Sequence, residues 1–345
     1  MFWKPVKFGD DIKIIYEDIR HPKFTVNFEN EEIQENFSRQ NVTYSETKDY
    51  LLETQKPVVI EPKLGIAILG KGKLLSQTRY HPYMFPDTLQ YWKYRRGKTP
   101  VRTLDEAIHF DGYVSTNYYN FFADAVMTLL WANEKAGLQL DKPIIVGQKT
   151  FNTRHFQWLY NNNEHFRNLK WEVLDGKTYI QVNKLYKAYL IVYDTPEWRR
   201  LIKYFNPPIV AAPKRKIFLY RKANVGRGVK NMNEIQPLLE KYGFEMIDTS
   251  DMTIDDQMAL FADVEYFIAI HGAGIMNAIF ANHPKFSMIE ILPGHEKMNI
   301  EFFWMSQLMG YKFYDAILTE DMDMKKRFRL EPDVLEHHIK KMLAN

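Results

Sequence analysis

The chain has 345 residues, 46% of them hydrophobic and 15% aromatic, which is typical of a folded protein and excludes a disordered one. A formal net charge of +3 is too small to indicate a nucleic-acid partner, and the absence of cysteine excludes disulfides and thiolate chemistry. The length is typical of two domains, and no stretch approaches the roughly 20 apolar residues of a membrane-spanning helix. We therefore expect a cytoplasmic protein, with peripheral association at the inner face of a membrane left open and the oligomeric state undetermined.

The first domain is predicted to cover residues 1–205. Residues 1–110 hold short apolar segments between turn-rich stretches and are expected to be irregular. From 110 to 200 the pattern is α/β: "GYVST" is predicted to be a strand, "NYYNFFADAVMTLLWANEKAG" a long helix, and "KPIIVG" and "LKWEVLD" two more strands. A proline-rich segment at 204–216 indicates the linker to the second domain.

The segment "YWKYRRGKTPVR", residues 91–102, mixes aromatic and basic side chains. Contact with an anionic acceptor or with lipid headgroups is one interpretation. A surface loop anchored by its aromatic residues is the other, and the sequence alone favours it.

Residues 206–345 are predicted to form a second, more regular domain. The strands "KIFLY", "FEMID", "YFIAI", "FSMIEIL" and "YKFYDAIL" alternate with helices, one of them capped by Thr253. This alternation predicts a parallel, Rossmann-like sheet, so the fold class is α/β. The amphipathic helix near the C-terminus is a candidate to pack back on the first domain.

The segment "AIHGAGIMNAIF" marks the point where one of these strands becomes a helix. His271 follows the strand, and Gly272 and Gly274 allow a close backbone approach that a side chain would block. A helix beginning near Ala273 directs free N–H groups and the positive end of its dipole to this point, which favours a phosphate group.

A basic loop leaves another strand at the same edge of the sheet. It carries Arg221, Lys222 and Arg227, and Arg221 is suited to a bidentate contact with a diphosphate. Glu290 lies near the end of the next strand, where a carboxylate can accept hydrogen bonds from a ribose. Each feature alone is common in proteins without this function; their shared position at strand ends favours a nucleotide site.

These blocks, in this order, resemble glycosyltransferase family 61 from about Lys214 to Tyr314: an Arg-rich loop, "YGF", a strand ending in "HGAG", an Asn three residues on (Asn277), and a strand with Glu and Pro. The resemblance implies a GT-B-like fold, with two Rossmann-like domains facing an inter-domain cleft. It also implies an inverting, metal-independent hexosyl- or pentosyltransferase, with a UDP-sugar donor in the second domain and a glycan acceptor in the first. We expect a role in bacterial surface polysaccharide synthesis, such as capsule formation.

A second block, "NYYNFFADAV", resembles the family's acceptor-side motif. Asn117, Tyr118 and Asn120 are its candidate acceptor-binding residues, although Asn120 stands where the family often has His. Asp124 is the predicted catalytic base, because it interrupts an apolar run and lies two helical turns after Asn117, on the same face. His271 is the rival base.

No metal is expected. The tripeptide Asp321-Met322-Asp323 resembles a metal-binding DxD, but it precedes a basic run near the chain end and is interpreted as a solvated loop. Two other functions stay open: a non-catalytic nucleotide-sugar or glycan-binding protein on the same scaffold, and a phosphotransferase that uses the same anion site.

Overall fold

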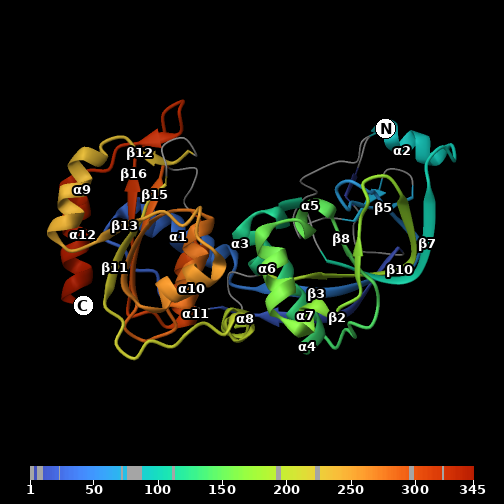
Figure 1. Cartoon of the computed structure of the whole chain (residues 1–345), viewed down its shortest axis with the longest axis horizontal. Helices are drawn as coiled ribbons and strands as arrows, with labels where there is room; N and C mark the ends of the chain where they lie inside the picture. The colour runs from blue at the N-terminus through green and yellow to red at the C-terminus, as the bar shows by residue number, and fades with distance from the viewer. Residues whose placement is uncertain are drawn as a thin grey trace. The chain divides into compact units, whose positions relative to one another are not determined.

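The computed structural model describes residues 4–5, 11–22, 24–70, 73–75, 88–110, 113–191, 196–221, 226–294, 299–320 and 322–345. They form two compact units (Figure 1). The N-terminal unit comprises Met1–Arg20 and Thr47–Val192, and the C-terminal unit comprises His21–Glu46 and Tyr193–Asn345. This division differs from the predicted boundary after residue 205, because the segment 21–46 and helix α8 (Glu197–Phe205) belong to the second unit.

The C-terminal unit contains a five-stranded parallel sheet in the order β13-β11-β14-β15-β16. The strands are β11 (Arg215–Leu219), β13 (Glu245–Ile247), β14 (Val264–Ile270), β15 (Ser287–Pro293) and β16 (Phe313–Thr319). The connecting helices are α9 (Met232–Lys241), α10 (Ile254–Ala262), a 3₁₀ helix (Ala273–Phe280), α11 (Glu301–Met309) and α12 (Pro332–Ala344). The predicted alternation of strands and helices is confirmed, and Thr253 caps α10 by accepting from the N–H of Asp256. In chain order the strands run 2-1-3-4-5, so the strand order reverses between β11 and β14.

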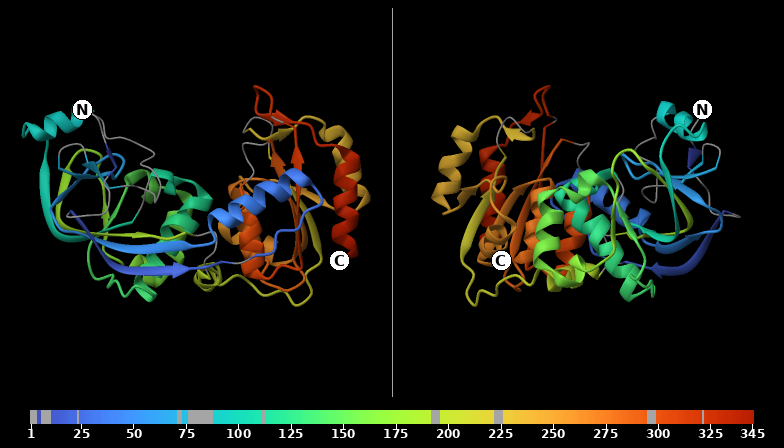
Figure 2. Two further views of the ribbon diagram at one scale, coloured as in Figure 1. Left: turned by 180° about the vertical axis from the view of Figure 1, so that it is seen from behind. Right: turned by 45° about the vertical axis from the view of Figure 1, so that its right-hand side comes forward.

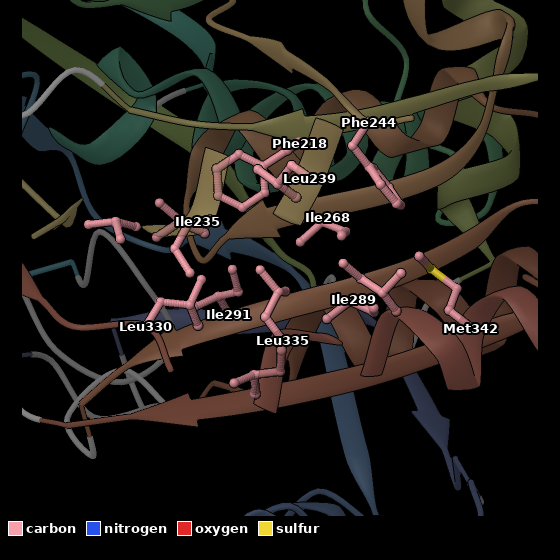
Figure 3. Packing of buried hydrophobic residues seen from close by; sticks show 14 of the residues in the cluster. Phe218, Ile235, Leu239, Phe244, Ile268, Ile289, Ile291, Leu330, Leu335 and Met342 are labelled. Atoms are coloured by element: carbon pink, nitrogen blue, oxygen red, sulfur yellow. The ribbon is translucent and has the colours of Figure 1, made fainter. Parts of the chain in front are cut away.

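Side chains that alternate along these strands bury both faces of the sheet. On one face Ile268, Ile289 and Ile291 pack with α9 and α12 (Figure 3). Helix α12 therefore packs on the sheet of its own unit.

The opposite face of the sheet explains why residues 21–46 belong to the C-terminal unit. Leu292 and Ala316 pack there against α11 and against Ile33 and Phe37 of α1 (Glu31–Thr43). Figure 2 shows α1 beside these strands. The apolar face of α1 is thus buried by partners more than 200 residues away, which local sequence patterns do not identify.

The N-terminal unit is built on a ten-stranded mixed sheet, in which β10, β7, β8 and β9 are parallel neighbours. These strands are β7 (Val101–His109), β8 (Ile144–Val146), β9 (Trp171–Val173) and β10 (Tyr179–Tyr189). The others are β1 (Lys4–Pro5), β2 (Ile12–Arg20), β3 (Thr47–Thr54), β4 (Val58–Ile60), β5 (Ala67–Leu69) and β6 (Lys73–Leu74), with helix α2 (Thr88–Arg95) before β7. Residues 1–110 are therefore more regular than predicted. The parallel part has the order 4-1-2-3, and the strand order reverses between β10 and β7.

The predicted strand "GYVST" is wrong. The strand lies upstream, where β7 pairs with β10 from Val101 to Ile108, and Tyr113–Thr116 is a 3₁₀ turn. This turn leads directly into the helical segment that Asn117 caps, which leaves no length for a strand.

The long helix predicted after it is confirmed in position but not in type. It consists of α3 (Tyr118–Asn120), a π-helix (Phe121–Val126) and α4 (Met127–Glu134). Helices α5 (Gln148–Phe151), α6 (Arg154–Asn162) and α7 (Glu164–Arg167) connect β8 to β9. Across the described ranges, no helix combines the length and apolar character needed to cross a membrane.

Candidate functional site

The strongest candidate site lies where the strand order of the C-terminal sheet reverses. Leu219 of β11 is in register with Ala269 of β14, so Arg221 and His271 follow the two neighbouring strands at the same level. In doubly wound sheets, ligands bind beyond the carboxyl ends of the strands at this reversal point. The structure thus places Arg221 and Arg227 beside the "HGAG" turn.

Gly272 allows two guanidinium groups to approach the backbone closely, in a backbone conformation that other residues rarely adopt. Its backbone has φ 155° and ψ 180°, and a Cβ atom placed on it would overlap the guanidinium of Arg221 and lie 2.9 Å from Nη1 of Arg227. Gly274 has a packing role instead, because a Cβ there would lie 2.9 Å from Cδ2 of Leu219. The first glycine therefore serves the candidate site, and the second serves the contact between the 3₁₀ helix and β11.

Arg221 and Arg227 form a partly buried cationic pair. Burial lowers the pKa of both guanidinium groups, and the charge of Arg227 lowers that of Arg221 further. Arg227 is held by a 2.5 Å hydrogen bond from Nη1 to the carbonyl oxygen of His271. Within the described ranges neither guanidinium forms an ion pair with a carboxylate. The charges of Glu301 and Glu290 oppose the effect of burial on the pKa of Arg227, whereas no carboxylate charge does so for Arg221, so an anionic ligand would supply a countercharge there.

His271 is oriented by a buried carboxylate. Its Nδ1 lies 2.5 Å from Oε1 of the fully buried Glu290, whose Oε2 accepts a hydrogen bond from the hydroxyl of Tyr314. Burial, followed by the charge of Glu290, raises the pKa of Tyr314 well above its ordinary value, so this hydroxyl stays a donor. Nε2 of His271 is directed to the side where Oε1 of Glu301 lies at 3.9 Å.

These contacts correct the role predicted for Glu290. Both of its oxygens are occupied by protein groups and no part of the residue reaches solvent, so it is not placed to bind a ribose. The structure gives Asn277 a contact inside the protein as well. It is fully buried, and its Nδ2 donates to Oε1 of Gln257 at 2.7 Å, which joins the 3₁₀ helix to α10. Ala273 is half-buried at the start of that helix, and Lys222 lies outside the described residues.

In the N-terminal unit, Asp124 lies on the π-helix that follows β7, a strand next to the reversal point of the parallel sheet. Its side chain is partly exposed, and burial raises its pKa to about 6, opposed by a 2.6 Å hydrogen bond from Nδ2 of Asn120. π-helical turns occur frequently at functional sites. A carboxylate with these properties is suited to accept a proton near neutral pH.

Asn117 and Tyr118 have local contacts, and acceptor binding by the residues of this block stays a prediction. Asn117 is exposed and caps α3 by accepting from the N–H groups of Tyr119 and Asn120. The ring of Tyr118 meets the rings of Phe122 and His155 edge-on, with centroids 5.3 and 6.0 Å apart. The expectation that Asn117 and Asp124 share a helix face assumed a regular α-helix, whereas residues 121–126 form a π-helix, so it stays a prediction. The contact of Asp124 is with Asn120.

Comparison with family models gives a match to Glycosyltransferase 61 over residues 118–288. Through these residues, the chain belongs to glycosyltransferase family 61. Asp124, Arg221, Arg227 and His271 all lie inside the matched range. Comparison with curated proteins gives no match. Family membership makes the chain a glycosyltransferase, an enzyme class that joins a sugar from a nucleotide donor to an acceptor glycan.

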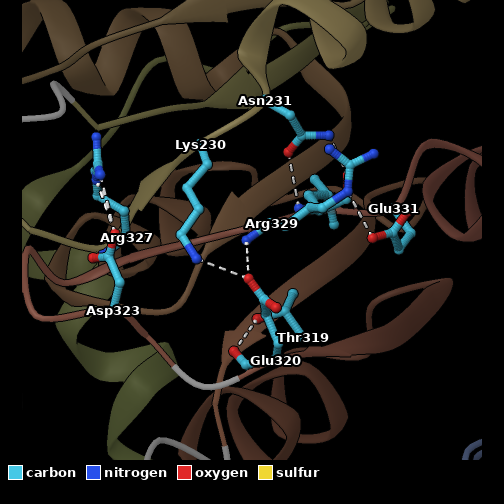
Figure 4. Close-up of polar contacts among 9 residues, drawn as sticks. Lys230, Asn231, Thr319, Glu320, Asp323, Arg327, Arg329 and Glu331 are labelled. Carbon is cyan, nitrogen blue, oxygen red and sulfur yellow. Dashed lines mark hydrogen bonds and ion pairs between the residues drawn. The ribbon is translucent and has the colours of Figure 1, made fainter.

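The DxD segment of this glycosyltransferase is only partly described, since Asp321 lies outside the described residues. Asp323 accepts hydrogen bonds from the backbone N–H of Arg327 at 2.8 Å and from its guanidinium (Figure 4). The carboxylate thus stabilises the turn before β17 (Arg327–Phe328). No group of three or more potential metal ligands occurs in the described part of the chain.

Sequence reasoning missed two polar residues of the glycosyltransferase's C-terminal site. Tyr314 lies on β16. Glu290 of the neighbouring strand β15 is in register with Ala316, and Tyr314 is two residues before Ala316. Strand alternation could have predicted this, because Glu290, Tyr314 and Ala316 face the same side of the sheet. Glu301 begins α11, and no local pattern in the sequence indicates that this helix starts beside His271.

Proposed function

We propose that this glycosyltransferase binds a UDP-sugar in its C-terminal unit and transfers the sugar, with inversion, to a hydroxyl group of a glycan. The observation that carries the proposal is the pair of partly buried guanidinium groups packed on Gly272 at the reversal point of the sheet. A diphosphate provides the two adjacent negative groups that such a pair requires. The N–H groups at the start of the 3₁₀ helix add further donors.

The leaving diphosphate is the group that needs stabilisation in this reaction. As the bond between the anomeric carbon and the phosphate oxygen breaks, negative charge develops on that oxygen, and Arg221 and Arg227 offset it without a metal. His271 donates Nδ1–H to Glu290, so its Nε2 is the nitrogen left for the ligand. In this proposal Glu290 positions His271 and does not bind the nucleotide.

Asp124 is the proposed base. The acceptor hydroxyl oxygen attacks the anomeric carbon from the face opposite the diphosphate, its proton passes to Asp124, and UDP leaves. A pKa of about 6 leaves the carboxylate ionised and basic near neutral pH. We propose that the N-terminal unit is the acceptor half and the C-terminal unit the donor half of a GT-B-like enzyme that builds a bacterial surface polysaccharide.

The proposal is tested by calorimetry with UDP and a panel of UDP-sugars. Replacing Arg221 with alanine removes a charged hydrogen-bond donor worth about 1.5–3 kcal/mol, so UDP affinity falls roughly tenfold or more. The matched control is Arg215→Ala, at the amino end of the same strand, where the side chain is paired with Glu245. Equal UDP affinity in the Arg221→Ala and wild-type proteins would refute the donor site.

Product analysis separates the proposed transfer from the other two functions. Release of UDP together with a glycosylated acceptor, or slow hydrolysis of a UDP-sugar, supports the enzyme. Release of a sugar phosphate supports a phosphotransferase, and binding of UDP-sugars without turnover across a broad acceptor panel supports a binding protein.

A further inference from the structure

Helix α2 is fixed to the N-terminal unit by two tyrosines. Tyr91 is 3% exposed, and its hydroxyl donates to the carbonyl oxygen of Gly70 at 3.3 Å. Tyr94 stacks on Tyr179 of β10, with ring centroids 4.7 Å apart. The aromatic anchors expected from the sequence are therefore these two residues, and they define the inward side of the helix.

The outward side of α2 carries apolar side chains in solvent. Leu89 is 64% exposed and Trp92 is 49% exposed. Lys93 is exposed on the same helix, and Arg96, also exposed, follows its last residue and continues the turn through a hydrogen bond from its N–H to the carbonyl oxygen of Trp92. These residues occupy positions i, i+3, i+4 and i+7, which lie on one side of a helix. We call these four residues the α2 face. The guanidinium carbon of Arg96 lies 5.7 Å from the centroid of the Trp92 ring, so cation and aromatic ring lie side by side.

The charge of this segment has one sign. Between Thr88 and Leu104 the sequence has five basic residues and no acidic one. Arg102 is paired with Glu172, whereas the exposed side chains of Lys93, Arg95, Arg96 and Lys98 form no ion pair within the described ranges. Lys93 and Arg96 are therefore available to a partner that meets the α2 face, and Arg95 and Lys98 lie beside them in the sequence.

We propose that the α2 face binds the surface of an anionic lipid bilayer. Tryptophan lies preferentially at the membrane–water interface, and basic residues are attracted by anionic headgroups. The exposed Leu89 favours lipid over an anionic glycan, because a bilayer offers a hydrocarbon layer that an aliphatic side chain can enter and a glycan does not. This inference does not rest on the proposed transfer reaction and concerns a different surface.

The test is co-sedimentation of the full chain with vesicles of phosphatidylcholine, alone or mixed with phosphatidylglycerol. The wild-type protein sediments with the anionic vesicles and not with the neutral ones. Changing Lys93 and Arg96 to alanine lowers the partition coefficient on the order of thirtyfold, since each cation near the surface contributes about a fivefold step. Changing Leu89 and Trp92 to serine lowers it at least roughly tenfold.

Two control variants match these changes elsewhere on the chain. The pair Lys203→Ala and Lys285→Ala removes the same charge from exposed positions, and Ile209→Ser removes an apolar side chain that is 96% exposed. Both controls keep wild-type partitioning. Equal losses in the control and α2-face variants, equal binding to neutral vesicles, or no vesicle binding would each overturn the proposal. UDP affinity, measured in the same proteins, stays unchanged, so a failure here is distinct from a failure of the donor site.

Discussion

The two units of this glycosyltransferase place opposite charges in the segments that follow their parallel strands. Each unit has parallel strands whose order reverses once. In the C-terminal unit, the residues that follow the reversal point are the cations Arg221 and Arg227 and the oriented His271. In the N-terminal unit, the helical segment after β7 carries Asp124, a carboxylate whose pKa is raised to about 6.

The difference separates two chemical tasks. Paired guanidinium groups stabilise an anion but accept no proton at neutral pH, because their pKa values stay far above it even when burial lowers them. A partly desolvated carboxylate with a pKa of about 6 can accept a proton but repels a diphosphate. Each unit therefore has the charge that suits one half of the transfer, and the predictions below test this division.

The largest effect is expected for Asp124→Asn. Removing a general base typically slows turnover by 10²–10⁴-fold, so we expect at least about a hundredfold loss with unchanged UDP affinity. The hydrogen bond to Asn120 can be kept by the amide. Turnover is measured by UDP release with the acceptor present. Near wild-type turnover in a normally folded variant would place the base elsewhere, and His271→Ala would be the next test.

The same variant has a stability signature. Because burial raises the pKa of Asp124, the folded protein binds a proton more tightly than the unfolded chain does, and the ionised side chain costs stability above pH 6. Asp124→Asn should therefore raise the melting temperature at pH 7.5 and leave it unchanged near pH 4. A lower melting temperature at both values would contradict the raised pKa.

A smaller effect is expected for Glu290→Gln. The amide removes the negative partner of His271 and can donate to Nδ1, which moves the imidazole proton to Nε2. Loss of a charged hydrogen bond of about 1.5–3 kcal/mol predicts a roughly ten- to hundredfold loss of turnover. Nitrogen NMR of labelled histidine reports the tautomer of His271. Tyr314→Phe is the milder control, because the carboxylate of Glu290 and its bond to His271 remain. An unchanged tautomer of His271 in Glu290→Gln would exclude the role of Glu290 in positioning His271.

Gly272→Ala should weaken UDP binding about tenfold. The new methyl group would displace the guanidinium of Arg221 and crowd that of Arg227, so the cationic pair could not keep its position. Gly243→Ala is the control, since Gly243 also has a positive φ but no atom lies within 4 Å of an added Cβ. Calorimetry with UDP compares the two variants. Equal losses in both would mean that backbone strain, and not displacement of Arg221, is measured.

Acidification should destabilise the N-terminal unit first. Burial lowers the pKa of His109 to about 3 and that of His155 to about 4, so the unfolded chain binds protons more tightly and stability falls as pH drops from 6.5. Between pH 6.5 and 5 each histidine costs about 2 kcal/mol, partly offset by Asp124. Glu29 and Glu336 of the C-terminal unit, with pKa values of about 2, stay ionised over this range. Hydrogen exchange measured for individual peptides shows which unit opens first as the pH falls. Earlier opening of the C-terminal unit would contradict the prediction.

The smallest effect is expected from chelation. Turnover should be unchanged in excess EDTA, and Asp323→Ala should affect only the turn that Asp323 forms with Arg327. An activity that EDTA abolishes and manganese or magnesium restores would show that a metal, and not the cationic pair alone, stabilises the leaving group.

The sequence by itself determined much of the C-terminal unit. Its strands are short apolar runs, Thr253 caps one helix, and Gly243 follows another, so each element carries a local signal. Parallel strands bring their carboxyl ends to one edge of the sheet, so the sequence predicts that Arg221 and His271 lie at the same edge.

Only the tertiary structure decided which partners these elements and side chains have. Segment 21–46 joins the second unit through contacts distant in sequence, and Glu290 is occupied by His271 and Tyr314. The π-helix that carries Asp124 and the exposure of the outward side of α2 were also visible only in the structure. Local patterns record what a residue prefers along its own helix or strand. Burial and hydrogen bonding are set by neighbours that only folding brings close, and these neighbours decided the proposed role of each polar side chain.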